Sequence, residues 1–439
     1  MEALKDKLES SFLVLENELN GQADTAVHGL RREAFKRFLQ MGFPTKRHEE
    51  WRYTNLKPIL KHDYRIFPKE DTSVEFKDIK RFFLSDQDTY KLVFVDGVYS
   101  SWLSQTTHQG FDVCTFSNML DKYKEVSDEY FAKALPKEEA LAAVNTAFAK
   151  EGAFIRIKKN ITADKPVELL FVSTDHGHEI MTQPRNLVVV EENAEVTIIE
   201  RHQSLSKSAV LTNTATEIFA LRDSRLNYYK IQNDNETASI IDSTSVKQYR
   251  NSSVNVGTFS FGNKLIRNNL NFFIEEEHTE SILDGITIIG DGQTVDHHTL
   301  VDHKVPNCYS DEMYKGIFDG NANGVFSGKV MVHPHAQKTN AFQKNNNVLL
   351  TDKASIDTKP QLEIYADDVK CSHGCTIGQL DDEALFYMMS RGIPEKEGKA
   401  LLLYAFANDA LRNVKLPALR KRLNKQIAIK LNVNLDFEL

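Results

Sequence analysis

Hydrophobic and polar residues follow three successive patterns along the chain. Up to about residue 85 the apolar residues have helical spacing, as in 34–39, a run that stops at 42–44. The segment 86–150 combines a short strand at 91–95 with helices around 117–134 and 137–150. These patterns predict a mostly helical N-terminal domain over residues 1–150. The apolar stripe of the first expected helix is Leu4, Leu8, Phe12, Leu15 and Leu19.

From about residue 152 to 378 the pattern changes to short runs rich in Val, Ile, Thr and Phe, separated by Asn, Asp, Gly and Ser. Many short strands at near-regular spacing are typical of a sandwich, a barrel or a solenoid. The length of the segment favours a β-helix, which grows by adding coils. We therefore expect a mainly β protein with a β-helix core over residues 151–378. The runs that carry this prediction are 167–173, 186–190, 195–199, 214–220, 225–231, 265–274, 281–289, 324–332, 347–350 and 361–364.

Helical patterns return at residue 379 and predict a C-terminal helical domain over residues 379–439. Acidic residues at 381–383 suit a helix N-terminus, and Gly392 ends that helix. Further helices begin at Pro394 and near Pro417. Helices at one end of a solenoid cap its strand edges and offer a surface for a partner. The candidate docking residues are Leu385, Tyr387, Leu402, Tyr404 and Phe406.

Composition and charge narrow the range of partners. Lys and Arg total 54 against 62 Asp and Glu, for a formal net charge of −8, so we expect no nucleic-acid partner. There is no apolar run of the roughly 18 residues that a membrane helix needs, and the charged N-terminus lacks a signal-peptide core. Four unevenly spaced cysteines indicate reduced thiols. We expect a cytoplasmic protein that does not bind membranes.

The most informative motif is the run Cys371-Ser372-His373-Gly374-Cys375. Alternate side chains of an extended strand point to the same face, so both thiols and the imidazole could converge on a soft metal or a sulfur-handling site. The spacing is not that of a zinc finger. The competing interpretation is that the cysteines are small apolar core residues.

Motifs of common enzymes are absent from the sequence. There is no GxxxxGK[ST], GxGxxG, GxSxG or HExxH, which disfavours an ATPase, a simple dehydrogenase, a serine hydrolase and a zinc protease. A rival hypothesis is a stand-alone metal-dependent enzyme on a β-helix, built from five imidazoles that could bind zinc or iron. The plainer interpretation makes them polar residues at corners and on the surface. These imidazoles belong to His297, His298, His303, His333 and His335.

Several strings of the chain resemble the SufB/SufD family of the SUF iron–sulfur cluster assembly machinery, and its SufD branch most. The most specific are ADDVKCSHG at 366–374 and TIGQLD at 376–381. Supporting strings cover the rest of the chain: GFPT at 42–45, EEWRYT at 49–54, FSGKV at 326–330, QKT at 337–339 and TKPQLEI at 358–364. Since the resemblance covers nearly the whole chain, it bears on the fold as well as on the function.

The resemblance implies a right-handed parallel β-helix between helical domains, and a scaffold subunit rather than an enzyme. It implies a SufB-like partner at the end of the β-helix, and a SufC-like ATPase at the C-terminal helices. His373 would take part in cluster assembly at the SufB interface, with Cys371 as a possible second ligand. Cys375 stands where the family often has Ala, so it is an added ligand or a neutral replacement. The implied cofactor is a transient Fe–S cluster or iron, which the isolated chain does not bind tightly. A homodimer of the isolated chain remains an alternative to pairing with SufB.

Overall fold

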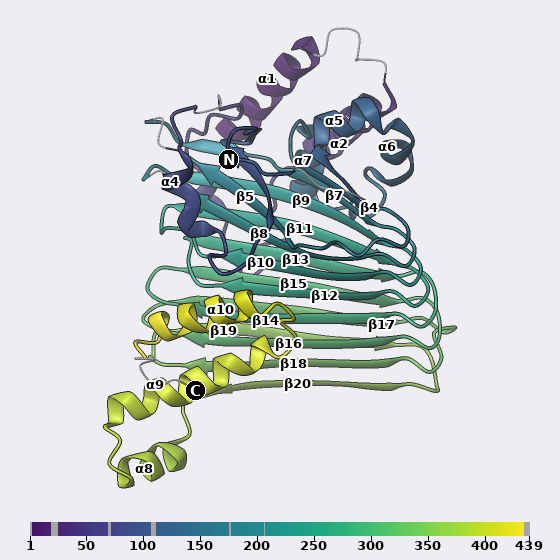
Figure 1. Ribbon diagram of the computed structural model, residues 1–439. Helices are drawn as coiled ribbons and strands as arrows, with labels where there is room; N and C mark the ends of the chain where they lie inside the picture. Colours follow the sequence, from purple (N-terminus) through teal and green to yellow (C-terminus); the bar gives the residue numbers. More distant parts are fainter. Residues whose placement is uncertain are drawn as a thin grey trace.

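The body of the protein is a flattened solenoid of parallel strands in two facing sheets, with helices at both ends (Figure 1). The structure is a computed structural model that describes residues 2–18, 25–68, 72–106, 111–174, 177–205 and 207–433. The mainly β solenoid with flanking helices confirms the predicted fold class. Within these described ranges, no helix combines the length and the apolar character needed to cross a bilayer.

The first sheet, called sheet 1 below, has two short N-terminal strands at one edge and the last strand of the solenoid at the other. Its strands in spatial order are β2 (Val98–Tyr99), β1 (Tyr90–Val95), β5 (Val167–Ser173), β8 (Glu195–Ser204), β10 (Arg225–Gln232), β12 (Ser253–Ser260), β14 (Glu280–Ile289), β16 (Tyr309–Phe318), β18 (Asn340–Leu349) and β20 (Lys370–Gly378).

The facing sheet, called sheet 2, holds the strands that alternate with these along the chain. Its order is β19 (Ser355–Ile364), β17 (Asn323–Val332), β15 (Thr294–His303), β13 (Leu265–Ile274), β11 (Ala238–Gln248), β9 (Val210–Ala220), β7 (Arg185–Val190), β4 (Ala153–Ile157) and β3 (Phe111–Thr115), and β6 (Ile180–Thr182) also pairs with β9.

Each coil of the solenoid contributes one strand to each sheet. The number of residues per coil varies, being smallest in the middle of the solenoid and larger towards both ends. Ser239 pairs with Leu265, 26 residues later, whereas Asn323 pairs with Ser355, 32 residues later. This varying period explains why the sequence shows no fixed repeat.

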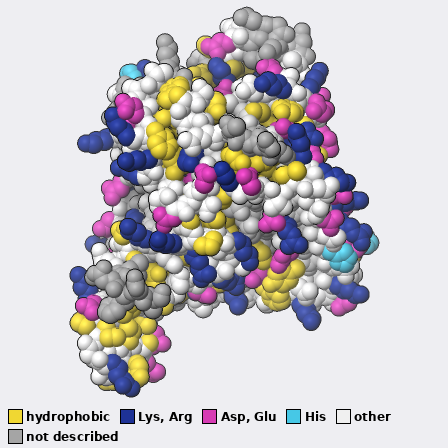
Figure 2. Space-filling view, viewed as in Figure 1, with side chains coloured by type: hydrophobic (Ala, Val, Ile, Leu, Met, Phe, Trp, Pro, Cys, Tyr) yellow, Lys and Arg dark blue, Asp and Glu magenta, His cyan; other side chains and the backbone are white. Residues whose placement is uncertain are grey.

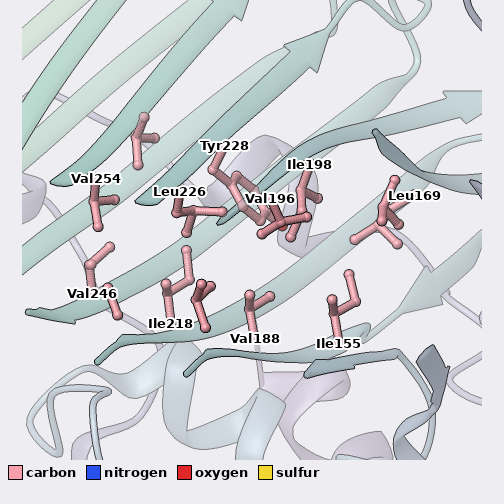
Figure 3. Packing of buried hydrophobic residues seen from close by; sticks show 14 of the residues in the cluster. Ile155, Leu169, Val188, Val196, Ile198, Ile218, Leu226, Tyr228, Val246 and Val254 are labelled. Atoms are coloured by element: carbon pink, nitrogen blue, oxygen red, sulfur yellow. The ribbon is translucent and has the colours of Figure 1, made fainter. Parts of the chain in front are cut away.

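Apolar side chains from the two sheets meet inside the solenoid (Figure 3). Val188, Ile218 and Val246 of sheet 2 face Val196 and Leu226 of sheet 1, and all five are almost fully buried. Burial of this apolar area is the main stabilising contribution, and the parallel ladders pair the backbone polar groups of the buried strands. The result is a rigid frame for residues at its ends.

The N-terminal helices lie at the upper end of the solenoid in Figure 1, and most of them pack on sheet 2 through Met181, Leu211 and Ile241. The helical segment 76–82 instead packs on sheet 1, against Val93 and Leu170. Leu4, Leu8, Phe12 and Leu15 are buried as predicted, and Leu19 lies outside the described residues. The expected helix around 117–134 is instead two short helices, and the next helix begins at 140 rather than 137. The elements are α1 (Glu2–Glu18), α2 (Ala26–Met41), η1 (Glu49–Trp51), α3 (Lys57–Leu60), α4 (Phe76–Ile79), η2 (Lys80–Phe82), α5 (Phe116–Lys122), α6 (Lys124–Tyr130) and α7 (Ala140–Ala147).

The C-terminal helices cover the outer face of sheet 1. Leu403, Leu411 and Leu419 pack there against Tyr229 and Phe259. The first of these helices projects beyond the last strand of the solenoid (Figure 1). The elements are α8 (Asp382–Ser390), α9 (Glu395–Asn408), η3 (Asp409–Leu411) and α10 (Pro417–Lys430), and their starts at Asp381, Pro394 and Pro417 agree with the sequence prediction.

Candidate functional site

The last strand of sheet 1, β20, has one open edge. Among the residues that the structure describes it pairs only with β18, so its other edge carries unpaired backbone groups. The N–H of Lys370 donates to the carbonyl of Thr339 on the β18 side. Since backbone groups alternate in direction along a strand, the N–H groups of Cys371, His373 and Cys375 point towards the open edge. An edge of this kind is a template for pairing with another chain.

The side chains of Cys371, His373 and Cys375 lie on the inner face of β20. They pair in register with Ala341, Gln343 and Asn345 of β18, which are buried inside the solenoid. The extended strand therefore places two thiols and one imidazole on one face, as the alternate spacing predicts. Because no coil follows β20, that face borders the open end of the solenoid.

The three side chains differ in their environment. Cys371 is half-buried beside Leu362 and Val369, and this burial raises the pKa of its thiol. Cys375 is exposed and its Sγ donates to Thr358 Oγ1 of β19 at 3.2 Å. His373 is exposed, and within the described part of the chain its imidazole has no hydrogen-bond partner.

Two buried polar residues are aligned in register with His373 on the two preceding strands of sheet 1. Gln343 is its register partner on β18, and Glu312 is the next along the sheet on β16. The Gln343 amide donates to Glu312 Oε2 at 2.7 Å. Burial raises the pKa of Glu312 to about 7, so its carboxyl can hold or release a proton near neutral pH. Sequence reasoning missed both residues because they lie one and two coils earlier, and only the coil register brings them to His373.

The candidate site does not supply a full coordination sphere by itself. Among the described residues, no group of three or more His, Cys, Asp or Glu side chains is close enough to hold a metal ion. All four cysteines are free, and Cys114 and Cys308 lie on β3 and in a buried turn, away from β20. Iron–sulfur clusters take four thiolate or imidazole ligands, so a cluster at β20 needs ligands from a second chain.

The rival hypothesis of a five-histidine metal site is wrong, because the five imidazoles do not converge. His297 and His303 point into the solenoid, where burial lowers the pKa of His297 to about 4 and of His303 to about 3. His298 lies on the opposite face of β15, and although burial opposes the shift, the Asp296 carboxylate raises its pKa. His333 contacts Asp302, and His335 is in the following turn.

Four of these imidazoles have polar partners within the protein. His297 contacts Thr287 Oγ1 at 3.0 Å, and His303 contacts Ser310 Oγ at 2.9 Å. His298 connects Asp296 to Glu50 of the N-terminal region, at 3.1 and 3.0 Å. Side chains that face different directions from one strand cannot share an ion.

The candidate docking residues of the C-terminal helices are exposed to different degrees. Tyr387 is exposed on α8, whereas Leu385 is buried against α9. Leu402, Tyr404 and Phe406 are half-buried, and the last two pack beside the apolar cluster under α9. The exposed apolar side chains of this corner are Phe386, Tyr387, Met389 and Leu401, and Figure 2 shows hydrophobic side chains over the projecting helix.

Comparisons with known proteins agree with this geometry. Residues 171–406 match the family described as SUF system FeS cluster assembly, SufBD core domain, and residues 3–169 match the SufBD protein N-terminal region. An iron–sulfur cluster assembly SufBD family protein of Synechocystis is 32% identical over 94% of this chain and 93% of its own length.

Two relatives carry the name iron–sulfur cluster assembly protein SufD. The one from Escherichia coli is 29% identical over 90% of this chain and 91% of its own length. The one from Bacillus subtilis is 24% identical over 85% and 86%. A parallel solenoid with an open, thiol-bearing end strand is thus the structure of a protein whose family and relatives are named for iron–sulfur cluster assembly. The chain belongs to the SufBD family of the SUF iron–sulfur cluster assembly system, and it is SufD-like.

Proposed function

We propose that this protein is a scaffold subunit that assembles Fe–S clusters at its β20 edge, in complex with a SufB-like paralogue and a SufC-like ATPase. The observation that carries the proposal is the position of His373, exposed on the inner face of the last strand. There it is accessible to a partner chain and lies between two thiols. The subunit itself catalyses no reaction in this proposal.

Pairing with the SufB-like chain would use the open edge of β20. Strand addition to an exposed sheet edge binds through main-chain hydrogen bonds and needs no apolar patch. The unpaired N–H groups of Cys371, His373 and Cys375 would be covered, and their side chains would then lie at the seam between two proteins. In the isolated chain the same edge could pair with a second copy, so a homodimer would compete with the heterodimer.

The ligand set suits transient binding. His373 and Cys371 are the proposed ligands, since imidazole and thiolate both bind iron in Fe–S centres. Coordination would remove the proton from the Cys371 thiol, whose pKa burial raises, so binding would release a proton. Cys375 would add a third ligand after its hydrogen bond to Thr358 breaks. With ligands shared between chains, a cluster can leave when the interface opens.

The SufC-like ATPase would dock on the corner formed by α8 and α9. Phe386 and Tyr387 are 72% and 59% exposed there, and this corner projects away from the solenoid (Figure 1). Exposed aromatic side chains on a polar surface mark protein interaction sites. Nucleotide hydrolysis would then belong to the partner, in agreement with the absence of a phosphate-binding loop from this sequence.

The test is anaerobic cluster reconstitution on the complex of this chain with its SufB-like and SufC-like partners. His373→Ala should lower the iron and sulfide content and the visible absorbance of the complex, because a ligand is lost. Ser372→Ala is the matched control, since Ser372 is exposed on the outer face of the same strand. Both variants should unfold like the wild type, because surface substitutions usually change stability by less than about 0.5 kcal/mol. Wild-type cluster content in His373→Ala would remove His373 from the site.

A further inference from the structure

A hollow whose charged lining is mainly Lys and Arg side chains lies far from β20. It is a space of about 690 Å³ on the outer face of sheet 1, between the η2 segment and α10. The described residues that line it include seven Lys and Arg side chains and a single acid, Asp86, which pairs with Lys421 at 2.9 Å. Figure 2 shows Lys and Arg side chains over α10 on this face. We call this space the α10 hollow.

The floor of the α10 hollow is formed by Arg201 of β8. This side chain is only 5% exposed, and among the described residues it has no hydrogen bond and no carboxylate within 4.0 Å. Burial and repulsion from Arg422 lower the pKa of its guanidinium to about 9, so it remains a cation at neutral pH. A buried cation without a partner is costly, and proteins keep such groups mainly at functional sites.

The surrounding charges do not neutralise Arg201. The acid that acts on Arg201 is Glu168, and its carboxylate oxygens already accept hydrogen bonds from the Leu84 N–H at 3.2 Å and from Thr89 Oγ1 at 2.7 Å. Arg422 of α10 donates to the carbonyls of Phe83 and Arg81, and the same Glu168 carboxylate acts on its charge, so one acid faces two guanidinium groups. A buried guanidinium group and a half-buried one are therefore fixed at the base of a space whose rim, at Lys425 and Ile429, is exposed.

We propose that the α10 hollow binds a small phosphate-bearing anion, with Arg201 and Arg422 holding the phosphate and Lys425 and Lys430 at the rim. Guanidinium groups match phosphate oxygens in two-point hydrogen bonds. The volume is in the range of sites for organic ligands and far exceeds one phosphate. Phe82, Phe83 and Ile429 supply an apolar wall for an organic part. Because Arg201 lies at the floor, a compact anion reaches it more readily than a folded partner surface.

This inference is independent of the proposed function, because it uses none of the residues at β20. The site also joins two parts of the chain, since Arg422 of α10 bonds to the η2 segment. An anion bound there would draw α10, η2 and sheet 1 together. Ligand binding should therefore raise the unfolding temperature of the whole chain.

The experiment titrates the full-length chain with inorganic phosphate and with phenyl phosphate by calorimetry. We expect saturable binding of one anion per chain, at least tenfold weaker in Arg201→Met. Tighter binding of phenyl phosphate assigns the site to phosphorylated organic molecules, and equal binding assigns it to free phosphate. Arg225→Met is the control, because Arg225 is exposed on neighbouring β10, and it should bind like the wild type.

A second readout separates a binding role from a structural one. Without ligand, Arg201→Met should unfold at the wild-type temperature or above, since the substitution removes a buried unpaired charge. Lys425→Gln at the rim should weaken binding severalfold and serves as the test if Arg201→Met does not fold. Absence of saturable binding, or equal affinity in Arg201→Met or Lys425→Gln, overturns the proposal. So does binding of an acidic peptide that neither phosphate probe displaces.

Discussion

Replacement of His297 by Gln should make the protein less sensitive to acid. The His297 ring is buried inside the solenoid, 3.2 Å from Asn268 Nδ2 and 3.0 Å from Thr287 Oγ1. Because the Asn268 amide is a donor, the network assigns the neutral tautomer in which Nδ1 accepts and Nε2–H donates. Protonation of Nδ1 would break the first bond and place a charge in the core.

The magnitude follows from the two protonation states. Burial lowers the pKa of His297 to about 4 in the folded protein, whereas in the unfolded chain it is about 6.5. The unfolded state therefore binds the proton more readily, and stability is lost as the pH falls below about 6.5. A pH of about 5 lies about 1.5 units below the unfolded-state pKa, and each unit lowers the free energy of unfolding by about 1.36 kcal/mol. The loss at this pH is therefore about 2 kcal/mol.

The assay is urea unfolding of the wild type and of His297→Gln, followed by circular dichroism near pH 8 and near pH 5. The stability advantage of the wild type over the variant should shrink by about 2 kcal/mol at the lower pH. Asp234 and Asp284 have raised pKa values because of burial and shift stability in the opposite direction. They are present in both proteins and cancel in the difference.

The control is His278→Gln, since His278 is exposed in a turn. Its unfolding free energy should follow the wild-type pH dependence. An unchanged difference between the wild type and His297→Gln across this pH range would refute the account of His297 as a neutral, buried structural residue.

Two further predictions concern the joint between the N-terminal helices and the solenoid, and the projecting corner. Arg185→Met should destabilise the protein by about 3–5 kcal/mol in chemical unfolding, because it leaves the buried carboxylate of Glu217 without its cationic partner; a variant as stable as the wild type would contradict this. Phe386→Asp should weaken binding of the SufC-like ATPase in a pull-down titration without changing thermal unfolding. Val14→Asp, which alters an exposed apolar residue on α1, should not weaken it, and equal affinity of both variants would argue against docking at α8.

Most of the fold could be predicted from apolar runs, and the exceptions have physical causes. The run at 265–274 has the same bounds as β13, because Leu, Ile and Phe residues at both of its ends mark a buried strand. The strands β11, β12, β15 and β16 escaped prediction since polar residues occupy both of their faces. On β15, for example, Asp296 is covered by the N-terminal segment, and His297 is satisfied by interior partners.

The candidate site was predictable only in part. The alternate spacing of Cys371, His373 and Cys375 identifies a common face from a period of two residues. The sequence does not reveal that β20 is the last strand or that Thr358 and Gln343 are its neighbours, because both features depend on coils of unequal length. Arg201 gave no signal in the sequence, because only the approach of α10 to sheet 1 turns a strand arginine into the floor of a hollow.

The central claim is that the edge of β20 is where a second protein binds. Amide hydrogen exchange of residues 370–378, measured on the chain alone and in complex with the SufB-like paralogue, tests it most directly. We expect the amides of Cys371, His373 and Cys375, which point to the open edge, to exchange much more slowly in the complex. Unchanged exchange across this strand in a fully formed complex would contradict the claim.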